Sequence, residues 1–164
     1  MLSTPAIDPK LYRDAMARYA GHVQIVTTAF EGVRRGVTIT AACSVSDSPA
    51  MVLVCLNRHN QNNDIFVESG IFALNTLAAH HKSLADAFAG FTKQDAEHRF
   101  AMGEWDEMVT GAPALKDAIA TYDCRIVDTK SVSTHNIFFG EVVGLRIGGK
   151  DPSLVYMDRS YHAI

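Results

Sequence analysis

Short runs of β-branched and aromatic residues recur along this chain, and they constrain its fold more than any other feature. The runs cover residues 23–28, 36–46, 51–56, 71–77, 122–129, 134–147 and 154–157. Such residues favour strands, and glycine, proline and aspartate lie in the turns between several of the runs. Helical patterns fall between the strands without alternating strictly with them. We therefore expect a mainly β protein, a closed antiparallel barrel with peripheral helices rather than a parallel βαβ sheet.

Three helices are predicted around these strands. Asp8 and Pro9 can cap and start the first helix, which carries apolar residues at helical spacing as far as Tyr19. A short helix over residues 62–69 is closed by Gly70, and a third over residues 82–89 ends at Gly90. The continuous apolar run at residues 51–56 predicts a strand that is buried on both faces.

The overall composition is that of a single compact domain, residues 1–164. Hydrophobic residues make up 48% of the chain, charged residues 20%, and the net charge is −3. This balance excludes the basic face of a nucleic-acid-binding protein. No apolar run approaches the roughly 18 residues of a membrane span, and the start lacks the pattern of a signal peptide. The odd set Cys43, Cys55 and Cys124 indicates reduced thiols, so we expect a cytoplasmic protein.

Two strand-like segments carry polar side chains where a core strand would carry aliphatic ones. Residues 36–46 include Thr38, Thr40, Ser44 and Ser46, and a segment in the second half of the chain carries His135. Hydroxyls and backbone amides suit phosphate and flavin-ring recognition without a glycine-rich loop. The alternative is structural, since threonine favours strands and a lone histidine in an apolar strand is commonly a hydrogen-bonded core residue.

The common cofactor- and metal-binding motifs are absent, and we expect the remaining notable residues to have structural roles. The sequence has no dinucleotide-binding G-x-G-x-x-G, P-loop, H-E-x-x-H or C-x-x-C motif. His80 and His81 are adjacent and so do not share one face of a helix or strand, and we predict no metal site. We expect Cys43 and Cys124 in the core, Trp105 in packing or a dimer contact, and residues 97–99 on a solvated helix face.

Nine short pieces, in order along nearly the whole chain, resemble the small flavin reductases with a split β-barrel. This family includes the reductase component of 4-hydroxyphenylacetate 3-monooxygenase. A closer likeness is to the flavoenzyme that reduces cob(II)yrinic acid a,c-diamide in aerobic cobalamin biosynthesis, through residues 19–21, 23–28, 41–47 and 133–135. The nine pieces are residues 36–38, 43–47, 53–57, 72–75, 88–90, 99–100, 110–113, 134–135 and 159–162.

The resemblance implies a split, Greek-key antiparallel β-barrel that forms a homodimer with flavin at or near the subunit interface. The cofactor would be FMN, with FAD also accepted by the family, and NADH or NADPH would donate hydride. Reduced flavin would pass to a partner monooxygenase. Two alternatives remain: a corrinoid reductase taking Co(II) to Co(I) ahead of an adenosyltransferase, and a flavin-binding split barrel without turnover.

The resemblance also implies which residues hold the cofactor. His135 would lie near the nicotinamide as the catalytic candidate. The loop at residues 58–63 lacks the serine with which many relatives hold phosphate, so Asn60 or Asn63 would donate instead and Arg58 could add charge. Arg159 or His135 would stabilise negative charge on the reduced ring. The implied cofactor-binding set is Thr38, Ile39, Thr40, Ser44, Val45, Ser46, Cys55, Leu56, Asn57, Asn60, Asn63, Phe88, Ala89, Gly90, His135, Arg159 and Tyr161.

Overall fold

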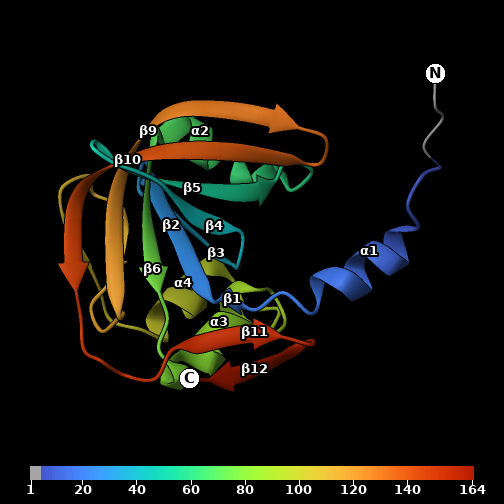
Figure 1. Ribbon diagram of the computed structural model, residues 1–164. Helices are drawn as coiled ribbons and strands as arrows, with labels where there is room; N and C mark the ends of the chain where they lie inside the picture. Colours follow the sequence, from blue (N-terminus) through green and yellow to red (C-terminus); the bar gives the residue numbers. More distant parts are fainter. Residues whose placement is uncertain (1–4) are drawn as a thin grey trace.

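A seven-stranded antiparallel sheet dominates the computed structural model, which describes residues 5–164 (Figure 1). Its strand order is β3-β2-β6-β9-β10-β5-β4, so strands that are distant in sequence lie side by side. All of its pairings are antiparallel, as expected. The strands are β2 (Gln24–Phe30), β3 (Val33–Ile39), β4 (Ala42–Asp47), β5 (Ala50–Asn57), β6 (Ile71–Thr76), β9 (Ala120–Val132) and β10 (His135–Ile147).

The two edge strands of this sheet, β3 and β4, follow each other directly in the chain, which bends the sheet around one core. Val37 of β3 and Ala42 of β4 both pack against the cluster that contains Phe66, Phe72 and Phe138. Both edges therefore reach the same interior although β3 and β4 are not paired with each other. The expected barrel, split at this seam, is confirmed.

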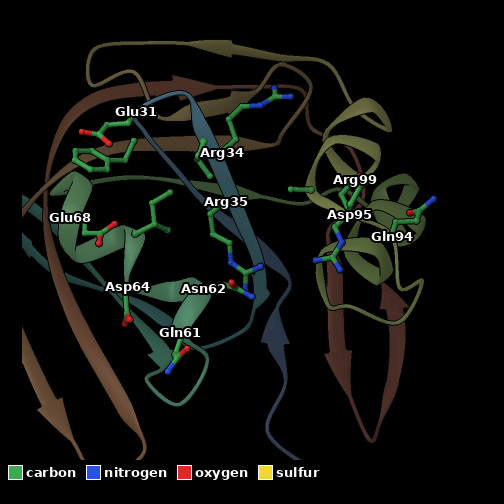
Figure 2. Close-up of a pocket in the computed structure, with 14 residues that line it drawn as sticks. Glu31, Arg34, Arg35, Gln61, Asn62, Asp64, Glu68, Gln94, Asp95 and Arg99 are labelled. Carbon is green, nitrogen blue, oxygen red and sulfur yellow. The ribbon is translucent and has the colours of Figure 1, made fainter.

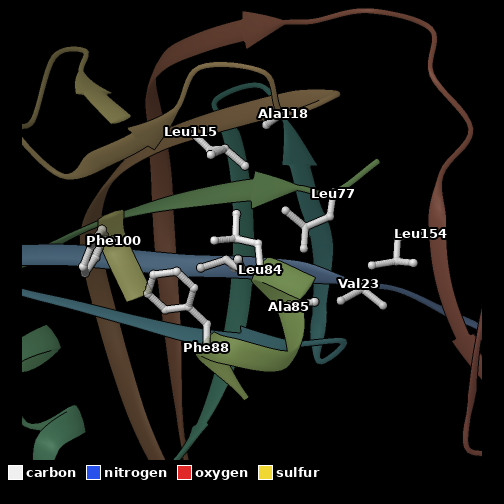
Figure 3. Close-up of a cluster of buried hydrophobic side chains, with 10 residues drawn as sticks. Val23, Leu77, Leu84, Ala85, Phe88, Phe100, Leu115, Ala118 and Leu154 are labelled. Carbon is white, nitrogen blue, oxygen red and sulfur yellow. The ribbon is translucent and has the colours of Figure 1, made fainter. Parts of the chain in front are cut away.

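A second core lies outside the barrel, between the sheet, helix α3 (Lys82–Phe88) and a small sheet of order β1-β11-β12 (Figure 3). It joins Val23, Leu77, Leu84 and Leu154, and Trp105 packs against it, as predicted for that residue. The remaining strands are β1 (Gly21–His22), β11 (Leu154–Met157), β12 (Ser160–Ala163) and the short pair β7 (Trp105–Glu107) and β8 (Pro113–Leu115).

The helices begin and end where local sequence dictates. Asp8 caps helix α1 (Pro9–Met16) by accepting from the Lys10 N–H at 2.9 Å, and Gly70 closes α2 (Ile65–Ser69) in the left-handed conformation. Helix α4 (Ala96–Ala101) follows α3, and two short 3₁₀ helices, η1 (Gln61–Asn63) and η2 (Ala79–His81), precede α2 and α3. Helix α1 extends away from the barrel (Figure 1), and none of its residues is buried.

Four details of the sequence interpretation are wrong. The 36–46 segment, predicted as one strand, is divided between β3 and β4. The run at residues 51–56 is not buried on both faces: Val52, Val54 and Leu56 are buried, while the alternate residues are only half-buried. The first helix ends at Met16, before Tyr19. Cys43 is exposed rather than in the core, although Cys124 is buried as expected. Among residues 5–164, no helix has the length and apolar character that a membrane crossing requires.

Candidate functional site

Five of the predicted cofactor residues line one cavity of about 200 Å³ at the end of strand β3. Thr40 is exposed there, and the cavity carries few polar atoms, since most of its wall is aliphatic or aromatic. A flat ring with polar edges fits such a wall, because its faces can pack on apolar groups while its edges reach hydroxyls and backbone amides. We call it the ring cavity; its lining is Val23, Thr38, Ile39, Thr40, Ala89, Phe91, Tyr156 and Tyr161.

The walls of the ring cavity are held by hydrogen bonds to helix α3. The Thr38 hydroxyl donates to the Ala85 carbonyl oxygen at 2.7 Å, and the Tyr161 hydroxyl donates to the Asp86 carboxylate at 3.0 Å. Burial, and then the Asp86 carboxylate, raise the pKa of Tyr161 above its ordinary value, so this phenol stays protonated. Gly36 lets the helix approach, because a Cβ there would lie 2.5 Å from the Phe88 ring. Because the Thr38 hydroxyl donates its proton to Ala85, this hydrogen bond holds β3 against α3.

The predicted segment 55–57 lies in β5, beside the turn that joins β3 to β4, and none of its residues lines the ring cavity. The Cys55 N–H donates to the Ala41 carbonyl oxygen at 2.9 Å, which places the backbone after Thr40 beside strand β5. Burial raises the pKa of the Cys55 thiol above its ordinary value, which makes the thiolate less available. Leu56 is 2% exposed and belongs to the barrel core.

The predicted residues of strand β4 are divided between two surroundings. Ser44 lines a separate cavity with His22 and Cys43, and Val45 is exposed. The Ser46 hydroxyl accepts from the Ser48 N–H at 3.2 Å, in the turn to β5. None of these residues lines the ring cavity.

A second group of predicted residues lies where β5 and β10 meet η1. His135 pairs with Asn57 in the sheet, and its Nδ1 lies 2.8 Å from the Thr134 hydroxyl. Asn60 caps η1 by accepting from the Asn62 N–H, and Asn63 donates to the Asn57 carbonyl oxygen at 3.0 Å. His135 is exposed, so its ring is open to a ligand from solvent.

The remaining predictions fall at the end of α3 and at the C-terminal hairpin. Phe88 is buried in the second core, Ala89 lines the ring cavity, and Gly90 has open space around it. Arg159 donates instead to Asp14 of helix α1 at 2.6 Å, from a turn position with φ of +59°, and does not line the ring cavity.

A larger cavity, of about 760 Å³, lies around the other end of β3 and was not predicted (Figure 2). Three arginines line it: Arg34 and Arg35 of the strand, and Arg99 of α4. The sequence interpretation placed Arg99 on a solvated helix face and Arg34 and Arg35 in a turn. In the structure Arg99 is half-buried, and the other two arginines lie in β3. The signal that could have found them is the Arg34–Arg35 pair directly before the predicted Gly36–Thr38 motif.

His80, His81 and Asp117 are the one group of possible metal-ligating side chains that lie close together in residues 5–164. His81 Nδ1 accepts from the Ala78 N–H at 3.0 Å, so in the neutral ring Nε2 carries the proton. That Nε2 lies 3.1 Å from the Asp117 carboxylate. The ring thus has no free lone pair for a metal ion, and burial lowers its pKa below the ordinary value.

Comparison with known proteins places this chain in a family. Residues 16–164 match the family described as "Flavin reductase like domain". A protein of Ancylobacter novellus named FMN reductase (NADH) RutF is 48% identical over 98% of this chain and 87% of its own length. A solved structure from Haemophilus somnus 129PT, 37% identical, superposes with a TM-score of 0.92 over 96% of this chain and all of that one.

The solved structure of flavin reductase HpaC complexed with NADP+ adds a relative that contains a pyridine nucleotide. It is 28% identical to this chain, superposes with a TM-score of 0.85, and the match covers 96% of this chain and 98% of that one. The family match covers most of the sequence and agrees with the split barrel described above. The chain belongs to the flavin reductase like domain family.

Proposed function

We propose that this protein is an NADH-dependent flavin reductase that uses FMN, with FAD as a second substrate. The observation that carries the proposal is the ring cavity, in which five of the residues implied by the resemblance lie together. Its close relative is named FMN reductase (NADH), and the HpaC structure contains NADP+. Reduced flavin would leave the protein and supply a partner monooxygenase.

The protein contributes position rather than a reactive group of its own. Hydride transfer requires the nicotinamide and flavin rings to stack, with donor carbon and acceptor nitrogen roughly 3–3.5 Å apart. The flavin supplies the redox chemistry when bound. Phe91, Tyr156 and Tyr161 offer aromatic surface to a ring, and the exposed Thr40 offers a hydroxyl. His135 is the proposed contact to the nicotinamide.

We also propose that the folded unit is one domain and that two copies associate through helix α1. Leu11, Tyr12 and Met16 are 63%, 58% and 45% exposed on a helix that buries no residue in its own chain. An amphipathic helix whose apolar side stays exposed in its own chain favours association, because water contact with that side is costly.

A blocking substitution tests the ring cavity. Ala89→Trp places a large side chain at its exposed rim, so we expect kcat/KM for FMN to fall by roughly a hundredfold, as misplacement of reacting rings does. Ala50→Trp, exposed at the β4–β5 turn away from that cavity, is the matched control. Equal activity of the two variants would contradict the proposed site.

A further inference from the structure

The cavity at the start of β3 is lined by three arginines and by four carboxylates, those of Glu31, Asp64, Glu68 and Asp95. Arg34, Arg35 and Arg99 line it together with the amide side chains of Gln61, Asn62 and Gln94. None of the three arginines forms an ion pair with a residue of the described range. Arginine offers five N–H donors in a planar fork, a geometry that matches phosphate.

Arg35 is held in place by a neutral partner. Its Nε and Nη2 donate to the Asn63 side-chain oxygen at 3.3 and 3.1 Å, and Asn63 is only 6% exposed. Asn63 is fixed in turn by its bond to the Asn57 carbonyl oxygen. The guanidinium is thus oriented without its charge being compensated. Burial, and then the charge of Arg99, lower the pKa of Arg35 below its ordinary value.

The side chain of Arg99 contains a buried donor without a partner. Its Nε is buried and has no hydrogen-bond partner among residues 5–164. An unpartnered buried donor on a charged group is costly unless a ligand satisfies it. Figure 2 shows the Arg35 and Arg99 side chains extending to the same side of β3, one from the strand and one from α4.

The four acidic residues of this cavity, Asp64 included, form no ion pair with these arginines. The Asp95 carboxylate accepts from the His98 N–H at 2.9 Å and lies 2.7 Å from His98 Nδ1, as the cap of α4. Glu31 and Glu68 lie on the far side of β3 from Arg99 in Figure 2. Arg34 stacks over the Phe100 ring, 4.4 Å from its centroid, which leaves Arg35 and Arg99 as the pair that faces a ligand.

We propose that this cavity binds the phosphate group of a nucleotide substrate, with Arg35 and Arg99 as its ligands. The inference rests on the proposed function, because the ring cavity begins three residues further along the same strand, roughly 10 Å at the rise of a β-strand. No arginine or lysine lines the ring cavity. The phosphate could come from the flavin nucleotide or from the pyridine nucleotide.

The experiment compares substrates with and without phosphate. Kd values for FMN and riboflavin are measured by flavin fluorescence, and KM for NADH is measured with riboflavin as acceptor. The variants are Arg35→Gln and Arg99→Gln, with Arg125→Gln as control, since Arg125 is exposed on β9. Circular dichroism confirms that each variant is folded.

Loss of a charged hydrogen bond weakens binding by roughly tenfold to a hundredfold. If the flavin supplies the phosphate, both variants raise the Kd for FMN by that factor and leave the Kd for riboflavin unchanged. If NADH supplies it, FMN and riboflavin Kd values stay equal to wild type and KM for NADH rises. The inference is overturned if both variants match Arg125→Gln in all three measurements.

A separate measurement distinguishes failure of the inference from failure of the proposed function. Calorimetric titration with inorganic pyrophosphate tests the cavity without any turnover, and binding to the wild type that Arg35→Gln weakens supports the phosphate site. A wild type that binds pyrophosphate in this way yet reduces no flavin would refute the reductase and retain the site. A wild type that reduces flavin but shows no Arg35-dependent phosphate binding would refute the site alone.

Discussion

At the scale of single residues, the packing of β3 against helix α3 depends on a close approach between the Gly36 backbone and the Phe88 ring. Gly36 lies between the two cavities on β3, and a Cβ at this position would come within 2.5 Å of the Phe88 ring. Phe88 itself packs edge-on against Phe100 and Trp105, so it has little room to move. The position therefore requires glycine for space, since its φ is not in the left-handed region.

Gly36→Ala should lower the free energy of unfolding by about 1–3 kcal/mol, because overpacking forces a buried ring from its place. Urea denaturation measures the change. Val33→Ala on the same strand, at a side chain that is 60% exposed, should change stability far less. Equal stability of the two variants would show that Phe88 does not constrain β3.

His81 gives the stability a dependence on pH. Burial lowers its pKa below the value of about 6.5 that it has in the unfolded chain, so the unfolded state binds its proton more readily. The contribution of neutral His81 is present above about pH 6.5 and is lost as the pH falls towards its lower folded-state pKa.

Wild type should lose more stability between pH 7.5 and pH 5.5 than His81→Asn, whose side-chain oxygen can still accept from the Ala78 N–H. Chemical denaturation at both pH values checks this. His59→Asn, at an exposed histidine, should behave as wild type. The same pH dependence in His81→Asn would mean that other groups cause it.

At the scale of elements, helix α3 connects the ring cavity to the second core. Its Leu84 and Phe88 are buried in that core, while Ala85 and Asp86 bind Thr38 and Tyr161. Apolar spacing predicted this helix to within one residue at its end. The hydrogen bonds were not predictable, because they join residues far apart in the sequence.

Tyr161→Phe should lower stability by about 1–2 kcal/mol, the value of a partly exposed hydrogen bond to a carboxylate. It should also speed hydrogen exchange in α3. Tyr156→Phe is the matched control, because the Tyr156 ring packs edge-on against Tyr161 and its hydroxyl has no hydrogen bond in the described structure. The idea fails if both variants lose the same stability.

The sequence predicted elements better than it predicted their surroundings. The β-branched and aromatic runs located the strands of the seven-stranded sheet but missed the short strands β1, β7, β8 and β12, and Gly70 located the end of α2. Exposure was harder to predict: Cys43 lies on an edge strand and is exposed, and one side of the 51–56 run is only half-buried. A strand's position in the sheet decides this, and no local pattern encodes that position.

At the scale of the whole molecule, the strand order places β5, which contains residues 55–57, beside the chain that directly follows residues 38–40. Ring-cavity residues such as Thr40, Ala89 and Tyr161 come from distant segments, so in the sequence only the family resemblance connects them. The arginine cavity was missed because Arg35 and Arg99 meet only through the packing of β3 and α4.

The exposed apolar side of helix α1 predicts that two copies of the chain form a dimer. Wild type should be a dimer by light scattering, and Leu11→Ser combined with Met16→Ser should yield a folded monomer, because neither side chain is buried within its own chain. Val67→Ser, at a comparably exposed apolar residue on α2, should remain dimeric. A monomeric wild type would contradict this arrangement.

Flavin reduction itself is the measurement that bears most directly on this account. Wild-type protein is mixed anaerobically with NADH and FMN, and the visible flavin absorption is followed. Bleaching of the flavin band with equimolar consumption of NADH, much slower in Ala89→Trp than in Ala50→Trp, is the predicted result. If FMN, FAD and riboflavin all stay oxidised with both NADH and NADPH, the protein is not a flavin reductase.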